Sequence, residues 1–89
     1  MSSLHLLIKG KVQGVFYRAS ARNVAENLAI TGWVKNTKEG NVEAVISGND
    51  EKLLQFVNWC RQGPPAAAVS EVIVTEITAP EFQQFSIVR

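Results

Sequence analysis

The apolar period of this chain changes from two to about 3.6 residues within its first 28 positions. Leu4, Leu6 and Ile8 alternate with their neighbours as in a strand that has one apolar face. Between Tyr17 and Leu28 the apolar residues recur instead at helical spacing. A strand therefore leads through a short turn directly into a helix, and that helix must pack back on a sheet to bury its apolar side.

The rest of the chain continues this alternation of strands and helices. Residues 31–36 and 42–46 predict two strands joined by a hairpin-type turn at residues 38–41. Asn49 or Asp50 can cap a second helix, and the segment 62–65 ends that helix. The apolar stripe predicted for this second helix consists of Leu53, Leu54, Val57 and Cys60.

Residues 71–77 and 85–88 predict the last two strands. The resulting order is β-α-β-β-α-β plus a short C-terminal strand. It predicts an α+β fold, a ferredoxin-like α/β sandwich in which two helices cover one face of an antiparallel sheet. A chain of 89 residues suffices for a single domain, so we expect one domain over residues 1–89.

Composition restricts the setting in which this domain works. Apolar residues make up 46% of the chain and charged residues 19%, which is typical of a soluble globular protein. The apolar runs are much shorter than the ~20 residues of a membrane span, and no secretory leader opens the sequence. Cys60 is the only cysteine, which excludes an internal disulfide and a cysteine-based metal site. We expect a cytoplasmic protein without membrane contact.

The charge distribution favours a small anionic ligand. The net charge of +1 argues against general nucleic-acid binding. Residues 1–45 hold six Lys and Arg against three Glu, a net charge of +3, whereas residues 46–89 hold three basic and five acidic residues, a net charge of −2. The positive half is the one that contains the first turn.

That first turn, Gly10-Lys11-Val12-Gln13-Gly14-Val15-Phe16-Tyr17-Arg18, has the features of a phosphate site. Gly14 permits the backbone to curl, the helix start offers free N–H groups, and Arg18 brings a guanidinium that fits two phosphate oxygens. No dinucleotide or P-loop signature is present, so we expect the site to hold one phosphate group. Taken alone, Gly14 also fits an ordinary turn and Arg18 an ordinary surface position.

Asn36 is the second candidate, because the topology brings it to the same rim. The helical crossover makes the first and second strands parallel, so their C-terminal ends lie at the same edge of the sheet. An amide at this position can hold an attacking water, although strand-end asparagines are also common turn formers. We expect Trp33, Trp59, Phe16 and Phe56 to be core or shelf aromatics, Cys60 to be buried, and His5 to lie on the surface.

No paired carboxylates, no histidine beside a nucleophile and no metal-binding cluster accompany these residues. An acyl phosphate needs no general acid, because its leaving group is a carboxylate with a pKa of about 4–5. A pocket that neutralises the phosphoryl group and positions water is sufficient for that reaction.

The sequence resembles the acylphosphatase family. The segment from Gly10 to Arg18 matches the family's first signature, the segment from Gly32 to Glu43 matches its second, and residues 63–69 are similar to its loop before the fourth strand. The resemblance runs nearly end to end. Tyr17 stands where phenylalanine is usual, and the chain ends at Arg89 without the terminal tyrosine of many members.

The resemblance implies specific roles. Arg18 would bind the phosphate of a small acyl phosphate, and Asn36 would orient the attacking water. The backbone N–H groups of the cradle would hold the phosphate; the cradle residues are Gln13, Gly14, Val15, Phe16, Tyr17 and Arg18. It also implies a monomer that uses no metal or cofactor and that is inhibited by its product, inorganic phosphate.

Two alternatives remain beside this interpretation. An RNA-recognition domain shares the topology but needs solvent-facing aromatics on its central strands, where this chain reads Val42-Glu43-Ala44-Val45-Ile46. A domain of a larger carbamoyl-transfer protein is the other; the chain's length and its lack of zinc-finger cysteines argue against it.

Overall fold

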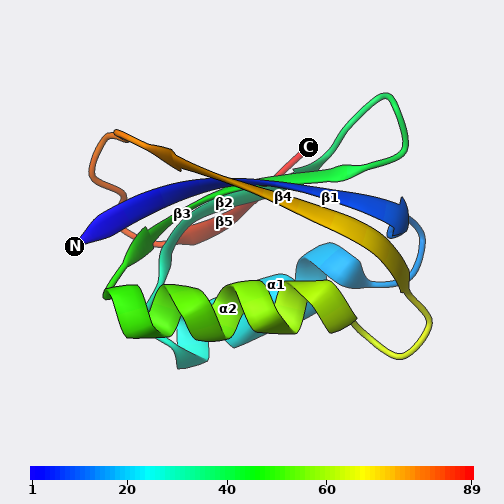
Figure 1. The fold of residues 1–89 in the computed structure, drawn as a ribbon, viewed down its shortest axis with the longest axis horizontal. Coiled ribbons are helices and arrows are strands. Elements are labelled where there is room, and N and C mark those ends of the chain that lie inside the picture. The colour runs from blue at the N-terminus through cyan, green and yellow to red at the C-terminus, as the bar shows by residue number, and fades with distance from the viewer.

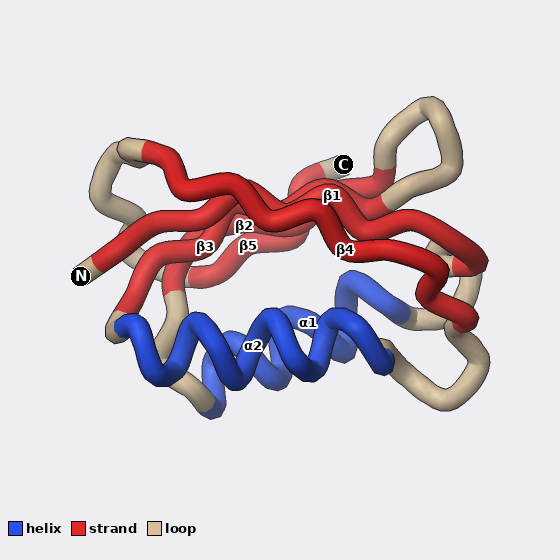
Figure 2. Tube along the Cα trace, in the orientation of Figure 1, coloured by secondary structure: helices blue, strands red, loops and turns tan.

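The five strands form one sheet, and both helices cover the same face of it (Figures 1 and 2). The computed structural model describes residues 1–89. In chain order the elements are β1 (Ser2–Lys11), α1 (Tyr17–Asn27), β2 (Thr31–Asn36), β3 (Val42–Gly48), α2 (Asp50–Gln62), β4 (Ala68–Ile77) and β5 (Phe85–Val88). The predicted order of elements and the ferredoxin-like fold are confirmed.

The strand order in the sheet is β4-β1-β3-β2-β5. β3 runs antiparallel to both β1 and β2. This makes β1 and β2 parallel and places their C-terminal ends at the same end of the sheet. The expected antiparallel sheet needs one correction: it is a mixed sheet, because β5 pairs with β2 in parallel. The chain crosses one end of the sheet after β4 and returns at the far edge, where the reversed direction matches that of β2 (Figure 1).

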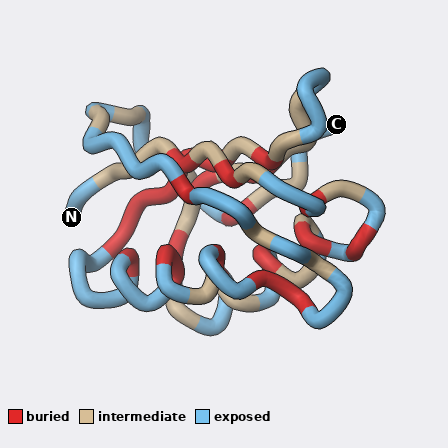
Figure 3. The backbone as a smooth tube through the Cα atoms, turned by 45° about the vertical axis from the view of Figure 1, so that its right-hand side comes forward, coloured by how far each residue is buried: buried red, intermediate tan, exposed pale blue.

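The core lies between the sheet and the two helices and contains 18 buried hydrophobic residues. Figure 3 shows the buried stretches where strands and helices face each other, with exposed backbone around the outside. Leu6 and Ile8 of β1 and Ala44 and Ile46 of β3 are fully buried, as period-two alternation requires. The two helices therefore pack on an apolar face of the sheet.

α2 buries a different stripe from the predicted one. Leu53, Val57 and Cys60 are buried as expected, but Leu54 is 61% exposed. Phe56 takes the remaining core position, because residues 53, 56, 57 and 60 share one helical face whereas residue 54 is turned about 100° from residue 53. Asn49 caps the helix, its Oδ1 accepting a hydrogen bond from the Glu51 N–H at 2.9 Å.

The face of the sheet opposite the helices carries a polar network. His5 is half-buried there, and its Nε2 lies 2.7 Å from Glu43 Oε2. Lys35 Nζ lies 3.7 Å from the other oxygen of Glu43 and 5.4 Å from the centre of the Trp33 ring. The predicted surface histidine is therefore a partner in a cross-strand contact.

Neither α1 nor α2 has the length and apolar character that crossing a lipid bilayer requires.

Candidate active site

The loop between β1 and α1, residues 12–16, is held to the core by two buried side chains. Val12 is 1% and Val15 5% exposed, so both anchor the loop from below. Phe16, predicted to lie in the core or against it, is instead 82% exposed. The two buried valines therefore anchor the loop to the core.

Two positive φ angles give this loop its curvature. Gly14 has φ 73° and Phe16 has φ 64°, with Val15 between them. A left-handed conformation costs a non-glycine residue roughly 1–2 kcal/mol, and such strain concentrates at functional sites. Alternation of this kind turns successive N–H groups into one concavity that suits an anion.

The N–H groups of this concavity are free to bind a ligand. Those of residues 13–16 donate to no other backbone group, and the first hydrogen bond of α1 runs from Ser20 N–H to the Phe16 carbonyl. The helix start has no side-chain cap and no acidic residue in its first turn. The positive end of the α1 dipole therefore faces this loop uncompensated.

Arg18 lies in the first turn of α1 and is half-buried. It makes no salt bridge: the close contacts of basic side chains with a carboxylate join His5 and Lys35 to Glu43. Its guanidinium is consequently not neutralised by a carboxylate, and its donor fork is available for an anionic ligand.

Asn36, the last residue of β2, has an unusual side chain. Its Oδ1 is buried and has no hydrogen-bond partner within the protein. A buried acceptor without a partner costs about 1–3 kcal/mol, so such atoms call for a functional explanation. A water or a substrate group that donates a hydrogen bond would satisfy this oxygen.

Arg18 and Asn36 line the same cavity, which has a volume of about 320 Å³. Gly14, Phe16 and Tyr17 contribute to its wall, so the structure brings the first turn of α1 and the end of β2 together as the sequence predicted. Its remaining lining residues are Val12, Ala19, Ile87 and Arg89. The cavity is large enough for a phosphate group and an adjacent water.

Two of the six predicted cradle residues do not line this cavity. The Val15 side chain lies in the core, and the Gln13 side-chain amide instead donates to the carbonyls of Thr37 and Asn41, at 2.8 Å each. The role predicted for both residues concerns their backbone N–H groups, and it stays a prediction.

Arg89 was not recognised as a site residue from the sequence. The parallel register of β5 pairs Val34 with Ile87 and Lys35 with Val88, and the residue that follows, Arg89, lines the same cavity as Asn36. The missing signal was the parallel direction of β5, because an antiparallel β5 would carry its C-terminus to the other end of the sheet.

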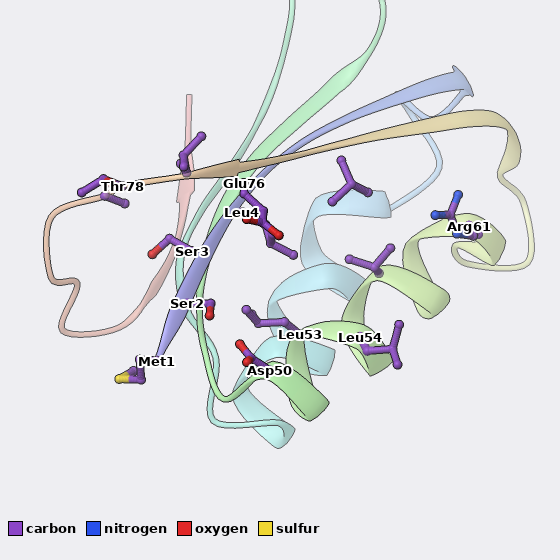
Figure 4. Close-up of a pocket in the computed structure, with 14 residues that line it drawn as sticks. Met1, Ser2, Ser3, Leu4, Asp50, Leu53, Leu54, Arg61, Glu76 and Thr78 are labelled. Carbon is purple, nitrogen blue, oxygen red and sulfur yellow. The ribbon is translucent and has the colours of Figure 1, made fainter.

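A larger cavity, of about 740 Å³, lies between α2 and the strands β1 and β4 (Figure 4). Asp50 and Glu76 line it together with Arg61 and several apolar side chains. Arg61 in this cavity is offset by the two carboxylates, and the cavity has no positive-φ loop and no unpartnered buried acceptor. The smaller cavity is therefore the candidate active site, despite its size.

No group of three or more His, Cys, Asp or Glu side chains is placed to hold a metal ion.

A buried hydrogen bond connects the start of α1, next to this loop, with α2. The Tyr17 hydroxyl donates to the Cys60 carbonyl at 2.8 Å, linking the start of α1 to α2. That carbonyl has no helical partner, because residue 64 is a proline without an N–H. Burial raises the pKa of the Tyr17 hydroxyl above its usual range and the pKa of the Cys60 thiol to about 12. Both groups are neutral at physiological pH.

Comparison with known proteins points to one family. The family model described as acylphosphatase matches residues 4–87. An acylphosphatase of Methylococcus capsulatus is 44% identical over 90 residues, an alignment that covers 100% of this chain and 98% of that protein.

Two solved structures extend the similarity to three dimensions. The acylphosphatase from Coxiella burnetii superposes with a TM-score of 0.94 at 42% identity, covering 98% of this chain and 92% of that one. The acylphosphatase from Bacillus subtilis gives a TM-score of 0.95 at 34% identity and covers 100% of both chains.

Proposed function

The chain belongs to the acylphosphatase family, and from that premise we propose that Arg18 and Asn36 carry out its catalysis. As a member of the family the protein is a hydrolase of acyl phosphates. The observation that supports this division of roles is the pairing, in one cavity, of an unneutralised guanidinium with a buried amide oxygen that lacks a partner.

The phosphoryl group of the substrate occupies the cradle. Backbone N–H groups of residues 13–18 donate to its oxygens, the α1 dipole favours its negative charge, and Arg18 binds two oxygens through its planar fork. These donors are fixed before the substrate arrives, so they stabilise the charge of the transition state without reorganisation.

Asn36 positions the nucleophile. Its Oδ1 accepts a hydrogen bond from a water and thereby directs a lone pair of that water toward phosphorus. The water oxygen forms a bond to phosphorus, the bond from phosphorus to the acyl oxygen breaks, and the carboxylate leaves with the bonding electron pair. A phosphate oxygen of the substrate takes the proton of the water, so the chain needs no basic side chain.

The carboxylate leaving group explains why no general acid is required. We propose that the reaction also needs no metal or cofactor, and that inorganic phosphate, the product, inhibits by occupying the same cradle. All of the contacts proposed here are made to the phosphoryl group and the attacking water, which supports a broad range of acyl groups.

The cellular setting is part of the proposal. We place the protein in the cytoplasm as a monomer of one domain, residues 1–89, without a nucleic-acid partner. The net charge of +1 and the single, fully buried cysteine support this setting.

Hydrolysis of a simple aryl acyl phosphate tests the proposal. We expect turnover by the wild-type protein, undiminished after treatment with a strong chelator, and competitive inhibition by inorganic phosphate. Turnover lost to the chelator and restored by added metal would overturn the metal-free mechanism. Retention of turnover in Arg18→Ala would overturn the role of the cradle arginine.

A further inference from the structure

The side chain of Gln13 joins the two halves of the site. Its Nε2 donates to the Thr37 and Asn41 carbonyls, which lie 24 and 28 residues further along the chain. Gln13 itself belongs to the loop that forms the phosphate cradle, whereas Thr37 directly follows Asn36. One amide group therefore spans the distance between the phosphate-binding loop and the water-positioning residue.

Both acceptors belong to the tight turn between β2 and β3. The Thr37 N–H donates to the Asn41 carbonyl at 2.9 Å, the Asn41 N–H donates to Thr37 Oγ1 at 3.1 Å, and the Gly40 N–H donates to the Thr37 carbonyl. Each of the two carbonyls thus accepts one bond within the turn and one from Gln13. The turn is closed without Gln13, so the two additional bonds serve to fix the turn against the loop.

We propose that Gln13 is a positioning residue, whose side chain sets the place of Asn36 relative to the bound phosphate. The inference rests on the proposed roles of Arg18 and Asn36. Gln13 does not line the cavity, so its side chain acts through Asn36 and not on the substrate. A displacement of about 1 Å between reacting groups can lower a rate by about a hundredfold, so such a link affects turnover strongly.

The test replaces the donor while keeping the shape of the side chain. Gln13→Met has nearly the same length but no donor, and Gln13→Ala removes the side chain beyond Cβ. The matched control is Gln55→Met, the same change at an exposed position on α2. We expect kcat to fall about tenfold or more in both Gln13 variants, while the inhibition constant of inorganic phosphate stays within about threefold. Gln55→Met should behave like the wild type.

A double-mutant cycle separates positioning from general loosening. If Gln13 acts through Asn36, Gln13→Met should lower kcat by less than about twofold when Asn36 is already alanine. An additional tenfold loss in that background would overturn the proposal. An unchanged kcat in Gln13→Met, or Gln13 variants that fold but lose phosphate affinity and turnover in parallel, would also overturn it. So would failure of both Gln13 variants to fold, because Gln13 would then be a structural residue.

The same experiments keep this inference apart from the proposed function. Normal turnover in Asn36→Ala would contradict the function assigned to Asn36 itself. Normal turnover in Gln13→Met, beside an impaired Asn36→Ala, would contradict only the role of Gln13.

Discussion

The Tyr17 hydroxyl lies 2.8 Å from the Cys60 carbonyl and donates to it a hydrogen bond that α2 cannot provide. Pro64 follows four residues after Cys60 and has no N–H, so the last turn of α2 would otherwise contain a buried carbonyl without a partner. Tyr17 immediately precedes Arg18. The contact therefore ties the arginine-bearing turn of α1 to the neighbouring helix.

Replacement of Tyr17 by phenylalanine should destabilise the protein. The variant Tyr17→Phe leaves the Cys60 carbonyl without a donor, which costs about 1–3 kcal/mol for a buried polar group. Urea unfolding monitored by circular dichroism measures this cost, and we expect a lower midpoint with an unchanged slope. A midpoint equal to that of the wild type would contradict the importance of the hydrogen bond.

Alkaline pH should destabilise the protein through Cys60. Burial raises the pKa of this thiol from 9.0 to about 12, so above pH 9 the unfolded chain releases a proton that the folded chain keeps. Because the folded state then binds more protons than the unfolded state, the free energy of unfolding falls as the pH rises from about 9 to 12. Below pH 9 this contribution is constant.

The measurement is the free energy of unfolding of the wild type and of Cys60→Ala at several values between pH 7 and pH 11. We expect a steeper alkaline decrease in the wild type, since the variant lacks the thiol. Equal slopes in the two proteins would show that the thiol does not carry the effect.

Two glycine substitutions should differ widely in their effect. A Cβ at residue 32 would lie 1.9 Å from the Val45 carbonyl oxygen, and φ at this position is +135°. Gly32→Ala must therefore push β2 away from β3, and we expect a loss of about 3 kcal/mol or more in the free energy of unfolding. A Cβ at Gly14 would meet no atom within 4 Å, so Gly14→Ala costs only the strain of its φ of +73°, roughly 1–2 kcal/mol.

Thermal unfolding of both variants against the wild type checks this difference. A Gly32→Ala protein as stable as Gly14→Ala would contradict the close approach of the two strands.

Arg18→Lys should be far from conservative. A lysine keeps the charge but cannot bind two phosphate oxygens in the plane of one group, so we expect kcat/KM to fall about a hundredfold. The control is Arg22→Lys, the same exchange at an exposed position one turn further along α1. Near-normal kinetics in Arg18→Lys would contradict bidentate binding.

The fold was predictable from the sequence to the extent that it depends on local periodicity. Two patterns predicted elements that the structure contains. The alternation of Leu4, Leu6 and Ile8 predicted β1, and the helical spacing of Leu53 and Val57 predicted α2. The direction of β5 was not predictable, because it depends on where the chain crosses the sheet after β4. The exposure of Leu54 was not predictable either, because the spacing of apolar residues on α2 does not decide whether Leu54 or Phe56 faces the sheet.

The candidate site was predictable where backbone topology determines it. Parallel strands bring the loop at Gly14 and the residue Asn36 to one edge, and the cavity includes both. The partners of long polar side chains were not predictable. Neither the contact of Gln13 with Thr37 nor that of Tyr17 with Cys60 has a signature in sequence spacing, since both join distant segments through side-chain geometry.

The most direct test of the assigned mechanism is the kinetic behaviour of Asn36→Ala, with the exposed Asn23→Ala as the matched control. Turnover of an aryl acyl phosphate and the inhibition constant of inorganic phosphate are measured for both variants and for the wild type. If Asn36 positions the attacking water while Arg18 and the backbone hold the phosphate, kcat falls about a hundredfold or more and phosphate inhibition changes less than about twofold. A parallel loss of phosphate affinity and turnover, or a kcat equal to that of the wild type, would contradict the division of roles between Asn36 and Arg18.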